Sequence, residues 1–382
     1  MKQLSWLLLY RVVNLLAPLG ITWLSLLSYG AEEYGEFVYY ISISAILSLG
    51  VKLSFEWNGL RQFKDKSDIE KSKLQSEFLG NQLILFLLII VCLVVISPVL
   101  NLRIEYLLLT MVYVLRDLFI SEYYLISMNE EKQLFFSMIF IRTVQFLLLI
   151  IFSAYMSIFY ALTIPILLTS IFIIVINKLS LKFRYNKCIE YLKSSKTLVL
   201  SKGIILIKDN LPIIIIEHFL GGQSVTIYDI FKKIITASSV PISVINSKFL
   251  SNSIKLSNRF SWAIISLPSL FMILLSLLYF SLNIDLLSFD ILPNMWVALC
   301  FSSLFLNSSS YLAIKYMISN RLDSVFLRLN LLTLMYTIIV LSLISYKEDA
   351  DISSYLLVVT SIYLIELIPR VVYVRRSFFI SR

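Results

Sequence analysis

Ionisable side chains stand inside apolar stretches of this chain, and they are the residues with the most chemistry to offer. Arg116 and Asp117 interrupt VYVLRDLFI, and Arg142 interrupts FIRTVQF. In the second half of the chain, comparable positions hold Lys208, Asp209, Asp229, Lys232 and Lys233. A charge in an apolar interior must face a partner or a hydrated cavity. The cations outnumber the carboxylates here, and a cavity with surplus Arg and Lys attracts anions.

These residues suggest two roles. The residues expected to bind an anionic ligand are Arg11, Lys52, Arg116, Arg142, Lys208, Lys232 and Lys233. Buried carboxylates beside cations are poised to exchange a proton or a cation, and the candidates are Glu56, Asp117 and Asp209. For each of these charges, a structural ion pair between helices is the open alternative. Asp229 and Lys233 are four positions apart, which places them on one helical face where they could pair.

Motifs of soluble enzymes are absent from the sequence. It contains no GxxxxGK[ST] phosphate loop, and its single histidine, His218, has no HExxH partner. Asp349-Ala350-Asp351 spells a DxD triplet, but it falls in a loop of about five residues, so we interpret it as a chance match. The three cysteines show no CxxC spacing. We therefore expect neither catalysis, nor a metal site, nor a cofactor.

The elements that carry these charges must lie in a membrane. Of 382 residues, 59% are hydrophobic and 15% are charged, and the mean hydropathy is +0.86. Soluble domains average about 25% charged residues, so a soluble core could not absorb this apolar surface. The net charge of +9 does not predict a nucleic-acid partner, because basic residues of membrane proteins gather in cytoplasmic loops.

Stretches of about 20 apolar residues, the length that crosses a bilayer, predict twelve transmembrane helices. They cover roughly residues 4–29, 35–57, 78–97, 104–126, 134–154, 158–177, 203–220, 225–246, 260–282, 294–316, 326–346 and 352–373. With the N-terminus inside, the cytoplasmic segments hold 21 Lys and Arg and the external loops hold 2. This asymmetry predicts that both termini are cytoplasmic. Arg370 lies near the cytoplasmic end of its window, so we expect its side chain to reach water.

The two halves of the chain show a weak internal repeat. A shift of 191 residues sets YGAEEYGEF, which starts at Tyr29, against LGGQSVTIY, which starts at Leu220, and aligns Gly30 with Gly221. Each stretch joins the first two windows of its half, and an even number of windows places the halves in parallel orientation. We predict two six-helix lobes, residues 1–190 and 191–382. Glycines permit tight geometry at helix ends, so Glu32 and Glu33 are interpreted as part of a structural hairpin.

The pattern Gly30-x-Glu32-x-Tyr34-Gly35-x-Phe37 resembles the first hairpin of Wzx-type O-antigen flippases, in the multidrug/oligosaccharidyl-lipid/polysaccharide exporter superfamily. The run FLGGQSVTIYDIFKKI, residues 219–234, followed by Pro241, resembles the family's second-half pattern, although Gln223 and Thr226 depart from it. The resemblance implies the flipping of undecaprenyl-diphosphate-linked oligosaccharides from the inner to the outer leaflet of the bacterial inner membrane. It also implies a cationic central cavity, alternating access, coupling to a proton or cation gradient, and a polysaccharide polymerase and chain-length machinery as partners.

Two other functions are open. A multidrug exporter of the same superfamily would have a more acidic cavity, suited to cationic drugs. An integral-membrane glycosyltransferase or O-antigen polymerase would need sizeable external loops to hold its catalytic groups. The longest external loop expected here, residues 283–293, is about eleven residues long and contains no Lys or Arg, which argues against the enzyme.

Overall fold

The computed structural model describes a helical protein. The described residues are 2–52, 59, 60, 62, 63, 66–96, 104–119, 122–176, 185–251, 293–318, 320–347 and 350–380, and no strand occurs among them. Each predicted window except 260–282 overlaps a described helix over most of its length, and window 260–282 lies outside the described residues. The all-helical membrane fold predicted from composition and hydropathy is therefore confirmed.

The helices of the first half follow its apolar windows. They are α1 (Lys2–Lys52), α3 (Asp68–Ile96), α4 (Ile104–Phe119), α5 (Glu122–Ser127), α6 (Glu131–Phe152) and α7 (Ile158–Ile176). In the second half, the helices are α8 (Tyr185–Leu220), α9 (Gly222–Ser238), α10 (Val240–Ser251), α12 (Pro293–Leu312), η1 (Ala313–Ile318), α13 (Asp323–Ser345) and α14 (Ile352–Ile380). The lobe boundary predicted at residue 190 falls inside α8.

Six of the described helical stretches are long and apolar enough to cross a membrane. The first, Ser5–Val51, has 47 residues, which corresponds to about 70 Å of helix and more than twice the hydrocarbon thickness. It therefore accounts for two predicted windows joined end to end. Leu88, Val95, Leu147 and Leu343 are among the large apolar side chains that stay exposed on long helices, as expected where lipid is the solvent.

Glycines bend the chain at the two places where the repeat predicts a hairpin. Gly30, inside α1, has φ 83° and ψ 174°, and Gly221, between α8 and α9, has φ 77° and ψ 178°. A side chain at either position would be strained, because L-residues avoid positive φ. The apolar windows on both sides continue as helix, so each glycine turns one span into the next.

A second pair of turns repeats in the same way. Asn129 and Arg321 have φ of 61° and 59°, and each precedes a long helix, α6 or α13. The hydrogen bonds match: Glu130 N–H donates to the Leu125 carbonyl at 2.9 Å, and Leu322 N–H donates to the Met317 carbonyl at 2.9 Å. This is the bonding of a helix C-terminus closed by a left-handed residue.

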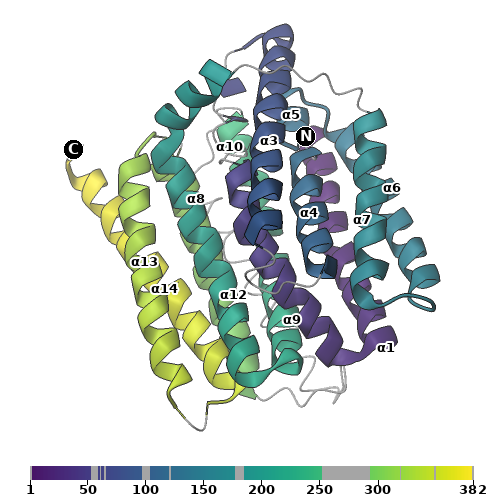
Figure 1. Ribbon diagram of the computed structural model, residues 1–382. Helices are drawn as coiled ribbons and strands as arrows, with labels where there is room; N and C mark the ends of the chain where they lie inside the picture. Colours follow the sequence, from purple (N-terminus) through teal and green to yellow (C-terminus); the bar gives the residue numbers. More distant parts are fainter. Residues whose placement is uncertain are drawn as a thin grey trace.

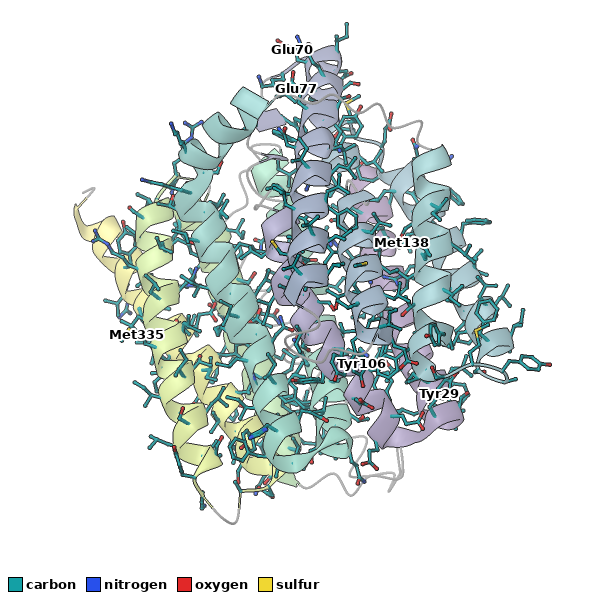
Figure 2. The ribbon with its side chains drawn as sticks, in the orientation of Figure 1. Tyr29, Glu70, Glu77, Tyr106, Met138 and Met335 are labelled. Atoms are coloured by element: carbon teal, nitrogen blue, oxygen red, sulfur yellow. The ribbon has the colours of Figure 1, made fainter. Side chains whose placement is uncertain are left out.

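The two bent hairpins lie against each other at one end of the molecule. α1 packs against both α9 and α8, and its kink lies at the lower end of the view, beside the junction of α8 and α9 (Figure 1). Glu70 and Glu77, on α3, lie at the opposite end from Tyr29 and Tyr106 (Figure 2). Glu70 and Glu77 belong to the predicted cytoplasmic segment 58–77. They thus lie at the opposite end from the predicted external hairpin, as the predicted topology requires.

Candidate functional site

A cavity of about 400 Å³ lies between helices from both halves of the chain. α1, α4, α6 and α7 form most of its wall, and α8 and α9 complete it. Four of the cations expected to bind an anion line this cavity: Arg116, Arg142, Lys232 and Lys233. Asp229 is the one carboxylate residue among its described lining residues, so the charged lining carries a formal excess of positive charge.

Arg142 lies in this wall, and no described carboxylate pairs with it. Its Nη2 donates to the Asn14 side-chain oxygen at 2.8 Å and its Nη1 donates to the Gln145 side-chain oxygen at 3.0 Å. Both acceptors are neutral amides, and the buried Nε has no hydrogen-bond partner in the described structure. A largely buried cation that no described anion neutralises is costly. Asn14 and Gln145 therefore orient the Arg142 guanidinium but do not neutralise its positive charge.

Arg116 brings a second guanidinium to the same cavity. Its central carbon lies 4.4 Å from the centroid of the Tyr113 ring, which holds the group by a cation–π contact. Tyr113 also lines the cavity. Two like charges in one enclosed space repel, and an anion placed between them would stabilise both.

Adjacent lysines on α9 contribute the remaining positive charge, and their partners differ. Lys232 Nζ donates to the Asp209 backbone carbonyl at 2.9 Å and to the Asn210 side-chain oxygen at 3.2 Å, which are both neutral. Lys233 Nζ lies 2.5 Å from Asp229 Oδ2, so the pair that the i,i+4 spacing allowed does form. Among the described contacts, Lys233 is therefore paired with a carboxylate, whereas Lys232 bonds only with neutral oxygens.

Lys208 belongs to a different cluster, which is buried in the second half. Its amine bonds with Glu366, whose carboxylate also pairs with Arg370 at 2.7 Å and accepts a bond from Ser309 Oγ at 3.0 Å. Arg370 is 2% exposed and donates to the Asn330 side-chain oxygen at 2.7 Å. The expectation that Arg370 reaches water is wrong, because Glu366 one turn earlier and α12 and α13 provide its partners.

Other expected site residues lie elsewhere. Arg11 forms an ion pair with Glu122, which also accepts a bond from Tyr10 at 3.0 Å. The Asp209 carboxylate is half-buried, 3.4 Å from Lys208. Glu56 and the side chains of Lys52 and Asp117 lie outside the described structure. Asp351, from the DxD triplet, caps α14 by accepting bonds from Ser353 and Ser354.

The sequence identified the buried cations but not the residues that bind them. Glu366 stands in the apolar run SIYLIELIPR, four residues before Arg370, and that spacing was a visible signal of pairing. Glu122 lies inside the predicted window 104–126, where a carboxylate is unexpected unless it is paired. Asn14 and Gln145 gave no comparable signal, because amides are common in such helices.

Comparisons with known proteins identify similar folds among solved structures. No protein-family model matches this chain, and no curated protein matches it significantly. An outward-facing multidrug resistance MATE family transporter of the MOP superfamily matches with TM-score 0.62 and 14% identity, over 98% of this chain and 95% of its own. A MATE protein in its straight conformation matches with TM-score 0.62 and 13% identity, over 98% and 94%.

A third match is a MOP superfamily transporter from Pyrococcus furiosus, described as having a binding pocket of reverse polarity that suggests a different function. It has TM-score 0.61 and 12% identity, over 98% of this chain and 94% of its own. At such low identity the likeness establishes the fold, which is that of MATE transporters of the MOP superfamily.

Proposed function

We propose that this protein is a flippase. Its cargo would be undecaprenyl-diphosphate-linked oligosaccharide repeat units of O-antigen or capsule type, moved by alternating access from the inner to the outer leaflet of the bacterial inner membrane. The observation that carries the proposal is the position of Arg142. It lines the cavity, Asn14 and Gln145 hold it, and none of the described carboxylates pairs with it.

Guanidinium chemistry favours a phosphate as the missing anion. The planar fork of Arg presents parallel N–H donors that match phosphate oxygens, and charge-assisted bonds of this kind are about twice as strong as neutral ones. Arg116 and Lys232 line the same cavity and would neutralise a second phosphate or an acidic sugar. The cavity would hold the polar head, while the lipid tail stays in the bilayer.

A multidrug exporter is the second candidate, and the fold is equally consistent with it. The polarity of the cavity argues against it, because its described lining residues include four cations and one carboxylate, and a cationic drug would be repelled. A transporter of similar fold is described as having a pocket of reverse polarity and a suggested different function. This fold therefore accommodates pockets of different charge, and the charge of the pocket is the better guide to cargo.

Binding of farnesyl diphosphate, a short isoprenyl diphosphate, tests the proposal on the purified full-length protein. We expect it to bind more tightly than farnesol, which has the same tail and no phosphate. Arg142→Ala should weaken binding about 10- to 100-fold, because bonds to charged groups contribute about 1.5–3 kcal/mol. Arg142→Lys should recover part of the loss, since the charge returns without the fork.

Arg328→Ala is the matched control, because Arg328 is exposed on α13 and is not among the residues that line the cavity. It should bind the diphosphate as the parent protein does. Equal binding of farnesol and farnesyl diphosphate would overturn the proposal, as would full affinity in a folded Arg142→Ala variant. Tight binding of a cationic dye in the same assay would favour the multidrug exporter.

A further inference from the structure

A polar cluster joins the two bent hairpins. Tyr34 on α1 donates its hydroxyl to Asp229 Oδ2 on α9 at 2.8 Å, across 195 residues of sequence. Lys233 Nζ lies 2.5 Å from both Asp229 Oδ2 and the Tyr34 hydroxyl, and it also bonds with Thr22 Oγ1. Thr22 Oγ1 is 2.9 Å from the Tyr34 hydroxyl. One carboxylate and one ammonium on α9 thus hold two hydroxyls on α1.

The same end of the molecule is closed by direct backbone contact. Thr226 Oγ1 donates to the Ala31 carbonyl at 2.5 Å. A β-carbon at Gly35 would lie 1.9 Å from the Gly222 carbonyl oxygen, and one at Gly222 would lie 2.5 Å from the Glu32 carbonyl oxygen. The hairpins can therefore meet this closely only through glycine. Tyr34 directly precedes Gly35 in the chain, so the polar cluster adjoins this contact.

Lys233 belongs both to this closure and to the cavity. Its ammonium has three N–H donors, and Thr22, Tyr34 and Asp229 offer one acceptor each. Lys233, Asp229, Tyr34 and Thr22 all line the cavity as well. A phosphate in the cavity would be a strong competitor for this ammonium, because it carries more charge than a hydroxyl and more acceptors than one carboxylate oxygen.

We propose that Tyr34, Asp229 and Lys233 form an anion-sensitive latch between the two halves of the chain. An anionic headgroup in the cavity draws Lys233 away from Asp229 and so releases the hairpin end. The latch rests on the proposed function in one respect, namely that the cavity takes an anion. It adds the step by which the presence of cargo changes the conformation of the carrier.

Loss of Lys233 would leave Asp229 as a buried carboxylate, with the Tyr34 hydroxyl as its remaining partner among the described residues. An uncompensated buried charge destabilises the arrangement that buries it, so the closed hairpins become less favourable and separation admits water. A ligand shifts a conformational equilibrium only by binding one state better than the other. Here the open state offers the anion a free Lys233, and the closed state does not.

A substitution of the neighbouring Lys232 shows whether an effect at Lys233 comes from the latch or from the loss of one positive charge. Its ammonium bonds with Asp209 and Asn210 of α8, so its contacts stay within the second half of the chain. Removing Lys232 removes the same charge one residue away without cutting a contact between the hairpins.

Distances between the hairpins in nanodiscs test the proposal. Spin labels at Glu33→Cys and Gln223→Cys, two exposed positions on α1 and α9, report the separation once Cys92, Cys188 and Cys300 are replaced by serine. Without ligand we expect a short distance in the parent protein and in Lys232→Gln. Tyr34→Phe and Asp229→Asn should show a longer-distance population. Farnesyl diphosphate should produce that population in the parent protein, and farnesol should not.

Lys233→Gln should lose this response to farnesyl diphosphate. The latch is overturned if ligand-free Tyr34→Phe and Asp229→Asn keep the parent distance, or if Lys233→Gln responds as the parent does. It is also overturned if farnesyl diphosphate binds in an Arg142-dependent manner and leaves the distance unchanged, in which case the proposed function stands. If the diphosphate does not bind, the proposed function and the anion sensitivity both fail, and the Tyr34→Phe result alone decides whether the contact closes the hairpins.

Discussion

Gly30 and Gly221 adopt nearly the same backbone conformation, φ 83°, ψ 174° and φ 77°, ψ 178°, although 190 residues separate them in the sequence. Each ends one helix of a hairpin and begins the next, and the two hairpins then touch through Gly35 and Gly222. The repeat is thus a repeat of backbone geometry, with little identity of side chains. A substitution at Gly30 or Gly221 would test the strain of a positive φ, whereas a substitution at Gly35 tests the contact between the halves.

Gly35→Ala should disrupt the closed hairpins. Its β-carbon would lie 1.9 Å from the Gly222 carbonyl oxygen, so backbone must move. Overpacking of this kind costs about 1–3 kcal/mol, and we expect a lower Tm in detergent and a longer hairpin distance. Gly20→Ala is the control, because its β-carbon would meet Phe146 at an ordinary 3.7 Å. An unchanged Tm and distance in Gly35→Ala would show that the hairpins do not meet this way.

Glu366→Gln should be among the most destabilising substitutions in the chain. It removes the anion shared by Lys208 and Arg370, two cations with 4% and 2% of their side chains exposed. Breaking a buried ion pair by removing one partner costs about 3–5 kcal/mol. Lys208→Met should cost less, because Glu366 keeps Arg370. Thermal unfolding in detergent measures both, and an equal Tm for Glu366→Gln and the parent would assign the cluster no structural role.

Asp351→Ala should lower stability in a pH-dependent way. Burial raises the pKa of Asp351, but hydrogen bonds from Ser354 and Ser353 outweigh it, so the folded pKa is lowered. The stabilisation is therefore fully present above the unfolded pKa, about 3.9, and lost as pH falls through the folded value. Losing a helix N-cap costs roughly 0.5–2 kcal/mol. The Tm difference between parent and variant should be present at neutral pH and shrink in strong acid.

Asp351→Asn provides the matched comparison for that measurement. Asparagine caps helices about as well as aspartate and does not titrate. Its Tm should follow the parent at neutral pH and fall less in acid. A parent and an Asp351→Ala variant with equal Tm at neutral pH would contradict the capping role.

Labelling of single cysteines in intact cells tests the orientation. Glu33, on the first hairpin, and Lys193, early in α8, are both exposed, and the excess of basic residues predicts Glu33 outside and Lys193 inside. An impermeant maleimide should modify Glu33→Cys and spare Lys193→Cys until the cells are broken. The reverse pattern would invert the topology and place the closed hairpins on the cytoplasmic side.

The membrane environment, the helical windows and the two turns could be read from the sequence because each depends on local properties. Transfer of side chains from water to lipid adds up along about 20 residues, so apolar windows identify helices without knowledge of their neighbours. Gly30 and Gly221 are likewise local, since the freedom to adopt positive φ belongs to the residue itself.

The partner of each buried charge was decided by the tertiary structure. Arg142 and Lys208 look alike in the sequence, each a cation inside an apolar window. In the fold, Arg142 bonds with side-chain amides of α1 and α6, which leave its positive charge facing the cavity. Lys208 is instead neutralised by Glu366, 158 residues away. The rotation and packing of the helices set which side chains face each other, and no local pattern encodes an ion pair between helices so distant in the chain.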